Sequence, residues 1–178
     1  NFGNLTSGLI AQKMGAPIRG FVAATNANRT IPDWIATGEY KARPSIATLS
    51  NAMDVGAPSN YERISAMYTL EEVRELFASY WLDDEGTSKA IKDCNSKTGY
   101  IIDPHGAVGY QAWNDIRKGA LDKLTAGVKN PIENPGLTPN LPSWANEVIN
   151  KQAVGIILET AHPAKFGDIV KSAIGRDP

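Results

Sequence analysis

The first residues of the chain have the composition of an anion-binding turn. The sequence begins with Asn1, Phe2, Gly3 and Asn4, and a helical pattern follows at once in LTSGLIAQKMG. At the start of a helix several backbone N–H groups lack partners and the positive end of the helix dipole lies beside them, so a phosphate fits there. Gly3 permits close approach of the backbone, while Asn1 and Asn4 add polar contacts. The same string is also typical of an ordinary turn, and neither GxxxxGKS/T nor GxGxxG occurs in the chain.

Two other stretches place polar side chains where ligands could bind. In LETAHPAKFGDIV an apolar run leads to Thr160, and ligands of open α/β sheets bind at the carboxyl ends of strands. A Thr hydroxyl that caps the next helix is the alternative interpretation. The stretch PSIATLSNAMDVGAPSNYERI contains Ser50, Asn51 and Asp54. Capping and turn formation account for many of its polar residues, but not readily for so many together.

Composition places the chain among ordinary globular proteins and excludes several classes of partner. Its 178 residues suffice for one domain with a substantial core, and 42% hydrophobic with 21% charged residues is typical of a soluble protein. The 18 Lys and Arg against 19 Asp and Glu leave a net charge of −1, which gives no electrostatic basis for binding nucleic acid. The apolar runs are too short to span a membrane. The single cysteine, Cys94, excludes an internal disulfide and fits a reducing cytoplasm; nothing near it indicates a nucleophile, and no metal site is predicted.

Short apolar runs alternate with amphipathic stretches along the chain. The pattern predicts helices over residues 5–15, 69–82, 87–99, 105–119 and 164–175, and strands over residues 17–26, 100–104 and 153–161. The last strand is almost entirely apolar, which suits a buried parallel position. Residues from about 127 to 152 are rich in Pro and Asn and predict an irregular excursion. Strands separated by helices form βαβ units, so the predicted fold class is α/β, with a mostly parallel sheet and helices on both faces.

Five blocks of the sequence together resemble the signature blocks of one enzyme family. They are NFGNLTSGLIAQKMG, FVAATNANRTIP, PSIATLSNAMDVGAPSN, DPHGAVGY and ETAHPAKF, in the order found in threonine synthases of many bacteria and fungi. The resemblance covers nearly the whole chain. It implies the large domain of the tryptophan-synthase β-like fold (fold type II) and a cytoplasmic enzyme that uses pyridoxal 5'-phosphate (PLP). Such an enzyme is a carbon–oxygen lyase acting on a phosphate ester, and it converts O-phospho-L-homoserine and water into L-threonine and phosphate.

The resemblance also implies roles for individual residues. Backbone N–H groups of residues 1–4 would hold the PLP phosphate, and Thr160 would face the pyridine nitrogen. A hydroxyl there, rather than a carboxylate, leaves the nitrogen largely unprotonated and tempers the electron sink. Ser50, Asn51 and Asp54 would be polar contacts around the substrate.

The catalytic lysine of the family is not found in this chain. The lysine that forms the Schiff base belongs to an SFKD-like block upstream of the phosphate loop, and no such block occurs here. Lys92 lies in a polar helical run without the preceding Ser-Phe, and Lys165 is expected on the surface at the start of the last helix. The family loop reads Ser/Thr-Gly-Asn-Phe-Gly-Asn/Asp, so the chain starts two residues into it. We therefore expect residues 1–178 to be a C-terminal PLP-binding fragment, inactive alone, whose missing N-terminal part carries the lysine. His105 and His162 are interpreted as structural histidines.

Two other functions remain open on the sequence. One is a different fold type II PLP enzyme, a serine/threonine dehydratase or a cysteine synthase, although those relatives lack SNAMDV and ETAHPAKF in this form. The other is a noncatalytic binding module, which the missing lysine favours superficially. A start inside a loop favours truncation instead, and an upstream reading frame that encodes SFKD would decide the question.

Overall fold

The computed structural model describes residues 1–118, 136–137, 142–150 and 152–178. Its helices are α1 (Gly3–Lys13), α2 (Thr30–Thr37), α3 (Asn60–Met67), α4 (Leu70–Leu76), α5 (Asp84–Thr98), α6 (Pro104–Arg117), α8 (Ala145–Ile149) and α9 (Gly167–Ile174). Two 3₁₀ turns, η1 (Asn51–Met53) and η2 (Pro163–Phe166), accompany three strands, β1 (Phe21–Thr25), β2 (Phe77–Trp81) and β3 (Gly136–Leu137). No helix in these parts of the chain is long and apolar enough to cross a membrane.

β2 is the central strand of the sheet. It pairs in parallel with β1, starting with Phe21 opposite Phe77, and it pairs antiparallel with β3, where Tyr80 lies opposite Leu137. Every residue of β2 is buried, as expected for a strand that is covered on both faces. The parallel β1–β2 pair confirms the predicted α/β class, and β3 adds a short antiparallel edge.

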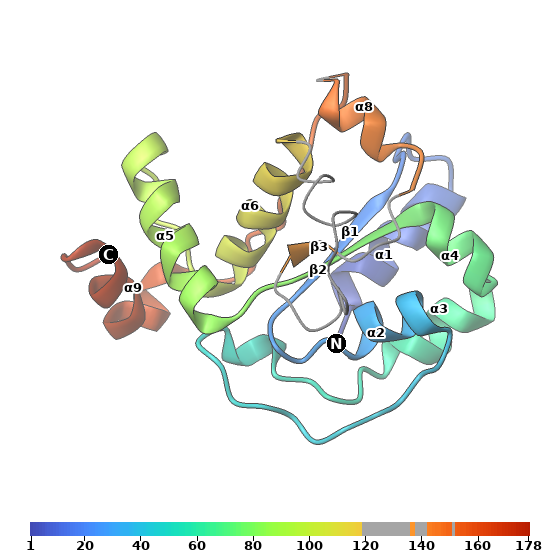
Figure 1. Ribbon diagram of the computed structural model, residues 1–178, viewed down its shortest axis with the longest axis horizontal. Coiled ribbons are helices and arrows are strands. Elements are labelled where there is room, and N and C mark those ends of the chain that lie inside the picture. Colours follow the sequence, from blue (N-terminus) through green and yellow to red (C-terminus); the bar gives the residue numbers. More distant parts are fainter. Residues whose placement is uncertain (119–135, 138–141, 151) are drawn as a thin grey trace, which may run out of the picture.

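Alternate residues of the parallel strands supply two separate cores. Ala78 and Tyr80 of β2 pack with buried residues of α5 and α6. Ala23 of β1 and Phe77 of β2 pack with buried residues of α1, α2, α3 and α4. Figure 1 shows α5 and α6 on one side of the strands and α1 to α4 on the other. Helices therefore cover both faces of the sheet, as the sequence predicts.

The single helix predicted over residues 69–82 is wrong in its second half. α4 begins with a capping box, in which Thr69 Oγ1 accepts the N–H of Glu72 at 3.2 Å and the Glu72 carboxylate accepts the N–H of Thr69 at 2.7 Å. The helix ends at Leu76, and β2 follows immediately. A short run of aromatic and small residues fits a helix and a buried strand equally well. Pairing with β1 decides for the strand, because it buries all of FASYW and satisfies its backbone.

Two predicted strands do not form in the described part of the chain. Residues 100–104 make no ladder and lead directly into α6. Residues 153–161 also lie outside the ladder, and Val154 and Ile156 are 93% and 85% exposed, so the predicted buried parallel strand is wrong. A strand needs a neighbour for its backbone hydrogen bonds, and in the described part of the chain this segment packs against α6 rather than beside a strand.

Helix ends follow local chemistry. α1 ends shortly before Gly15, and α5 ends at Gly99. These glycines have φ angles of 100° and 74°, a region of backbone conformation that favours glycine. α5 starts earlier than predicted because the Asp83 side chain caps it and accepts the N–H of Gly86 at 2.8 Å. Of the Pro- and Asn-rich excursion, residues 136–137, 142–150 and 152 are described and include β3 and α8; its other residues lie outside the described part of the chain.

Candidate functional site

α1 begins with the geometry of an anion-binding turn. Phe2 precedes it with φ 60° and ψ 24°, and in the described part of the chain it is the one residue other than glycine with a positive φ. Its carbonyl accepts the N–H of Thr6 at 2.9 Å and the hydroxyl of Thr6 at 2.8 Å. The N–H groups of Gly3, Asn4 and Leu5 therefore precede the first helical bond. Because the helix start has no side-chain cap and no acidic residue in its first turn, these groups can hold a phosphate.

Asn1 is fastened to the start of α3. Its Oδ1 accepts the N–H of Ser59 at 2.8 Å and the hydroxyl of Ser59 at 3.0 Å, and its carbonyl accepts Nδ2 of Asn60 at 2.8 Å. A Cβ on Gly3 would meet nothing closer than Asn60 Nδ2, at 4.0 Å, so the space beside the glycine is open. Asn1 thus positions the turn, and its predicted contact with an anion stays a prediction.

A polar network holds residues 46–56, called here the polar loop, beside the carboxyl end of β1. Asn26 is 1% exposed, and its Nδ2 donates to Thr48 Oγ1 and to Asp54 Oδ1, each at 2.8 Å. Asn28 Nδ2 also donates to Asp54 Oδ1, at 3.1 Å. Neither Asn26 nor Asn28 is predicted from the sequence as a site residue. Their place directly after a strand is the signal that would have identified them.

The three residues predicted to contact a substrate are of two kinds. Ser50 is 1% exposed, and its Oγ accepts Nδ2 of Asn26 at 3.1 Å. Asp54 accepts the N–H of Thr48 at 3.0 Å and the hydroxyl of Thr48 at 2.7 Å. Asn51, the first residue of η1, is exposed. Ser50 and Asp54 therefore shape the polar loop, whereas Asn51 faces solvent.

His105 joins the polar loop to the start of α6. The N–H of Ala52 donates to His105 Nε2 at 3.1 Å. On the other side of the ring, Nδ1 lies 2.5 Å from Asp103 Oδ1, which also accepts the backbone N–H of His105 at 2.8 Å. Because Nε2 accepts a hydrogen bond, the proton of the neutral ring is on Nδ1 and is donated to Asp103. The Phe166 ring packs on the imidazole with centroids 4.8 Å apart, so the histidine is structural, as interpreted from the sequence.

The carboxyl group of Glu159 lies at the same helix start. A Cβ on Gly106 would collide with both Glu159 carboxyl oxygens, so this carboxyl rests on the glycine backbone. Glu159 is exposed as a whole residue, but its carboxyl lies beside that of Asp103, which is fully buried. Burial, the hydrogen bond and the charge of Asp103 together raise the pKa of Glu159 to about 8. Burial also raises the pKa of Asp103, but hydrogen bonds with His105 and Glu159 outweigh it and lower that pKa to about 2.

Thr160 follows Glu159 and is exposed. A series of contacts connects it to the opening turn. Glu159 lies on the start of α6, His105 joins α6 to the polar loop, and Ser59, after that loop, binds Asn1. These groups lie on the carboxyl side of β1 and β2, the side where ligands of open α/β sheets bind. That Thr160 and the opening turn contact two ends of one cofactor stays a prediction.

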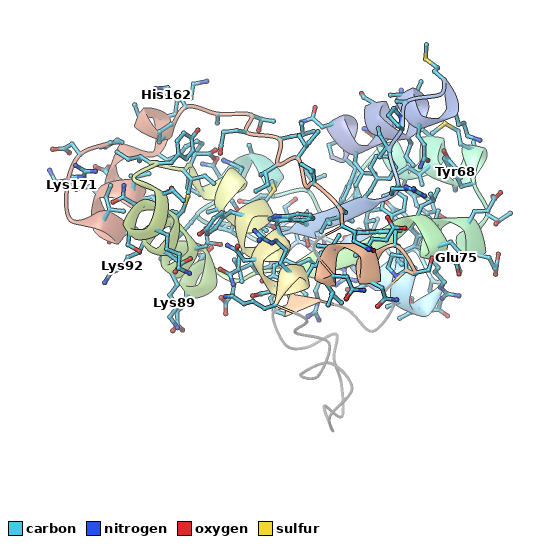
Figure 2. The ribbon with its side chains drawn as sticks, turned by 90° about the horizontal axis from the view of Figure 1, so that it is seen from above. Tyr68, Glu75, Lys89, Lys92, His162 and Lys171 are labelled. Carbon is cyan, nitrogen blue, oxygen red and sulfur yellow. The ribbon has the colours of Figure 1, made fainter. Side chains whose placement is uncertain are left out.

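The other reactive side chains weighed from the sequence lie at the surface or are inert. Lys92 on α5 and Lys165 in η2 are exposed, and Figure 2 shows Lys92 on the outer side of its helix. His162 is also exposed, and its Nδ1 accepts the N–H of Ala164 at 3.2 Å. Burial raises the pKa of the Cys94 thiol, which makes it a poor nucleophile at neutral pH.

A surface hollow lies away from these residues. It is lined by the end of α1 and by α4 and its approach, namely by Gln12, Lys13, Tyr68, Glu71, Glu72, Arg74, Glu75 and Leu76. Figure 2 shows Tyr68 and Glu75 at the opposite end of the molecule from His162, which follows Thr160 closely in sequence. The hollow is therefore separate from the end of the molecule that carries Thr160.

Comparison with known proteins finds relatives along nearly the whole chain. A family model described as "Threonine synthase, C-terminal" matches residues 143–178. The threonine synthase of Haemophilus influenzae is 38% identical over 177 residues, which cover 98% of this chain and 34% of that protein. The threonine synthase of Escherichia coli (strain K12) is 34% identical over 178 residues, which cover 98% of this chain and 33% of that protein. The chain thus spans about a third of the length of these curated relatives.

Solved structures show the same relationship. The crystal structure of threonine synthase from Escherichia coli matches with a TM-score of 0.74 and 31% identity, covering 99% of this chain and 34% of that chain. The structure of PLP-bound threonine synthase from Brucella melitensis matches with a TM-score of 0.69 and 27% identity, covering 100% of this chain and 37% of that chain. The likeness therefore includes the parallel strands, the opening turn and the polar loop.

Proposed function

The chain belongs to the threonine synthase family, and from this premise we propose that it forms part of an enzyme that converts O-phospho-L-homoserine and water into L-threonine and phosphate. Because it spans about a third of its relatives, the proposal concerns the share of the active site that residues 1–178 supply. The relatives described above are named threonine synthases, which favours this activity over a dehydratase, a cysteine synthase or a noncatalytic module.

The observation that carries the proposal is the open start of α1. The N–H groups of Gly3, Asn4 and Leu5 precede the first helical bond and have no side-chain cap, which fits the phosphate of PLP, the cofactor bound by the Brucella melitensis relative. Bound there, PLP would supply an electron sink for chemistry at the carbons of the substrate. The contribution of the turn is to hold the phosphate and to fix the direction in which the ring points.

We propose that the hydroxyl of Thr160 contacts the pyridine nitrogen of PLP. Unlike a carboxylate, a hydroxyl brings no negative charge to the nitrogen, which therefore stays largely unprotonated. An unprotonated pyridine ring would withdraw electrons less strongly. Such a cofactor suits elimination of phosphate and addition of water better than it suits transamination. The assignment is supported by the family match, by the exposure of Thr160 and by its attachment through Glu159 to the start of α6.

The polar loop would supply the substrate contact. Asn51 is the predicted residue whose side chain is exposed, so we assign the direct contact to it. Ser50 and Asp54 would affect substrate binding indirectly, because their hydrogen bonds to Asn26 and Thr48 set the shape of the loop. A substitution at Asn51 should therefore raise KM with little effect on folding.

The lysine that attaches the cofactor would come from outside these residues. No SFKD-like block occurs in residues 1–178, and Lys92 on α5 and Lys165 in η2 are both exposed. We propose that a longer polypeptide, of which this chain is one part, provides that lysine. The chain's own share of the reaction is then binding and orientation.

Phosphate binding tests the opening turn directly. Titration of the ¹⁵N-labelled chain with inorganic phosphate should shift the amide resonances of Gly3, Asn4 and Leu5 far more than those at the start of α5, which Asp83 already caps. Gly3→Glu should abolish the shifts because a carboxylate would occupy the positive end of the helix. Gly3→Gln, of the same size but neutral, should keep most of them. Equal behaviour of the two variants would refute the phosphate site.

Phosphate release from O-phospho-L-homoserine tests the activity and the lysine assignment separately. We expect no release by the chain alone in the presence of PLP. Release should appear when the chain is joined to an upstream segment that contains an SFKD-like block. Turnover by residues 1–178 alone would contradict the lysine assignment without bearing on the phosphate site.

A further inference from the structure

We propose that Glu159 and Asp103 share one proton, and that this acid–carboxylate pair positions Thr160 by fastening its segment to the start of α6. The shared proton stands independently of any cofactor. Only its consequence for the pyridine nitrogen rests on the proposed function. Glu159 is thereby a positioning residue, which acts through the backbone of its neighbour.

The unfilled hydrogen-bonding capacity of Asp103 points to the shared proton. Asp103 is fully buried, and its Oδ1 accepts both the N–H and the Nδ1–H of His105. Its Oδ2 has no donor in the described part of the chain unless Glu159 supplies one. A buried carboxylate oxygen without a donor is costly, and two ionised carboxylates in contact repel each other. One proton on Glu159, donated to Asp103, removes both penalties.

Gly106 provides the space for this pair. Any side chain at position 106 would place its Cβ against both carboxyl oxygens of Glu159. The glycine therefore lets the Glu159 carboxyl lie directly on the first turn of α6. Sharing one proton leaves the pair with a single negative charge, which the positive end of α6 stabilises.

The titratable groups around the pair are consistent with a neutral Glu159. His105 of α6 is hydrogen-bonded to Asp103 on the side away from Glu159. Cys94 of α5 and Tyr100 after α5 face the pair from the neighbouring helix; burial raises the pKa of each, and the charge that Glu159 would carry raises it further. Among the described residues, no lysine or arginine shifts the pKa of Glu159.

The pair completes a connection between the two predicted contact regions. The N–H of Ala52 in the polar loop binds His105, His105 binds Asp103, and Asp103 binds Glu159, the residue before Thr160. The segment that carries Thr160 has no strand partner in the described part of the chain, so this side-chain bond takes the place of a ladder in fixing it. Loss of the proton would remove the anchor next to Thr160, while Gly155 and Ile157 would still pack on α6.

Infrared spectroscopy of the chain without cofactor tests the shared proton. At pH 7 the spectrum should contain a carboxylic-acid C=O band that disappears as the pH rises above about 8 and that is missing in Glu159→Gln. Glu85→Gln, at an exposed carboxylate paired with Lys89, is the control and should leave the band unchanged. A wild-type spectrum without the band at pH 7, or with the same band in Glu159→Gln, would overturn the proposal.

The order parameter of the Thr160 methyl group, measured by ¹³C relaxation, tests the positioning of Thr160. It should fall from pH 7 to pH 9 in wild type, because the proton that joins Glu159 to Asp103 is lost. Glu159→Gln keeps a donor that does not titrate, so its order parameter should persist at pH 9, whereas Glu159→Ala should have the lower value at both pH values. Equal order parameters in wild type and Glu159→Ala would refute the positioning role. Because no PLP is present, this result is distinct from the phosphate titration.

Discussion

The backbone N–H of Ala52 donates to Nε2 of His105, 3.1 Å away, and this bond ties the polar loop to the start of α6. The two residues lie far apart in sequence, and the loop has its other anchors in Asn26 and Asn28, just beyond β1. The polar loop is thus held from the start of α6 and from the end of β1, and α2 and α5 add bonds through Thr30 and Asp84. Its shape depends on these anchors.

Removal of the imidazole should loosen the polar loop. In His105→Ala the N–H of Ala52 loses its acceptor and Asp103 loses a donor, so we expect a loss of about 1–3 kcal/mol in unfolding free energy. Urea unfolding measures the loss, and faster hydrogen exchange at Ala52 should accompany it. His162→Ala is the matched control at an exposed histidine and should stay within about 0.5 kcal/mol of wild type. Similar losses in both variants would contradict the role of His105.

The pair of Glu159 and Asp103 should make stability fall as the pH rises. The pKa of Glu159 is raised from its ordinary value of 4.5 to about 8 in the folded chain, so between these values the folded chain holds a proton that the unfolded chain has lost. Its stabilisation is therefore complete below about pH 4.5 and lost by about pH 8. Urea unfolding from pH 5 to pH 9 should show this decline in wild type and a flatter profile in Glu159→Gln. Parallel profiles would count against a raised pKa.

Gly106→Ala should not give the stabilisation that is usual for helices, because the Glu159 carboxyl, the far end of a flexible side chain, must leave its place beside Asp103. Gly→Ala in a helix commonly stabilises by about 0.5–1 kcal/mol, but here the new Cβ would collide with the Glu159 carboxyl. Gly167→Ala, in the first turn of α9 with nothing near its Cβ position, is the control and should show the usual gain. In a Glu159→Ala background, Gly106→Ala should become stabilising too. A thermal-unfolding cycle over the four proteins measures this difference, and additive effects would disprove the contact.

Asn26→Ala should disrupt the polar loop. Asn26 Nδ2 donates to Asp54, Thr48 and Ser50, and its Oδ1 accepts the N–H of Asn28, so its removal takes one donor from each of three groups and leaves the Asn28 N–H without its acceptor. The expected loss is about 1–3 kcal/mol in chemical denaturation. Asn51→Ala, at an exposed position in the same loop, should change stability by less than about 0.5 kcal/mol. If Asn51→Ala proved the more destabilising of the two, the division of the loop into shaping and exposed residues would be wrong.

The family and the helix ends could be recognised in the sequence because both depend on nearby residues. The glycines at 15 and 99 end helices through their own backbone conformations, and the turn at residues 1–4 opens α1 as predicted. The signature blocks likewise sit in short continuous stretches. Capping and turn formation act over a few residues, so the local amino-acid sequence determines them.

Tertiary structure decided the elements and contacts whose partners are distant in sequence. FASYW became a strand because β1 lies beside it, and residues 153–161 remained unpaired because no strand lies beside them in the described part of the chain. Ser50 and Asp54 turned inward because Asn26 and Asn28 reach them from the end of β1. Glu159 meets Asp103 only because the segment before η2 crosses the start of α6. Strand pairing and the sharing of a proton both require two groups to meet in space, and only the folded chain brings them together.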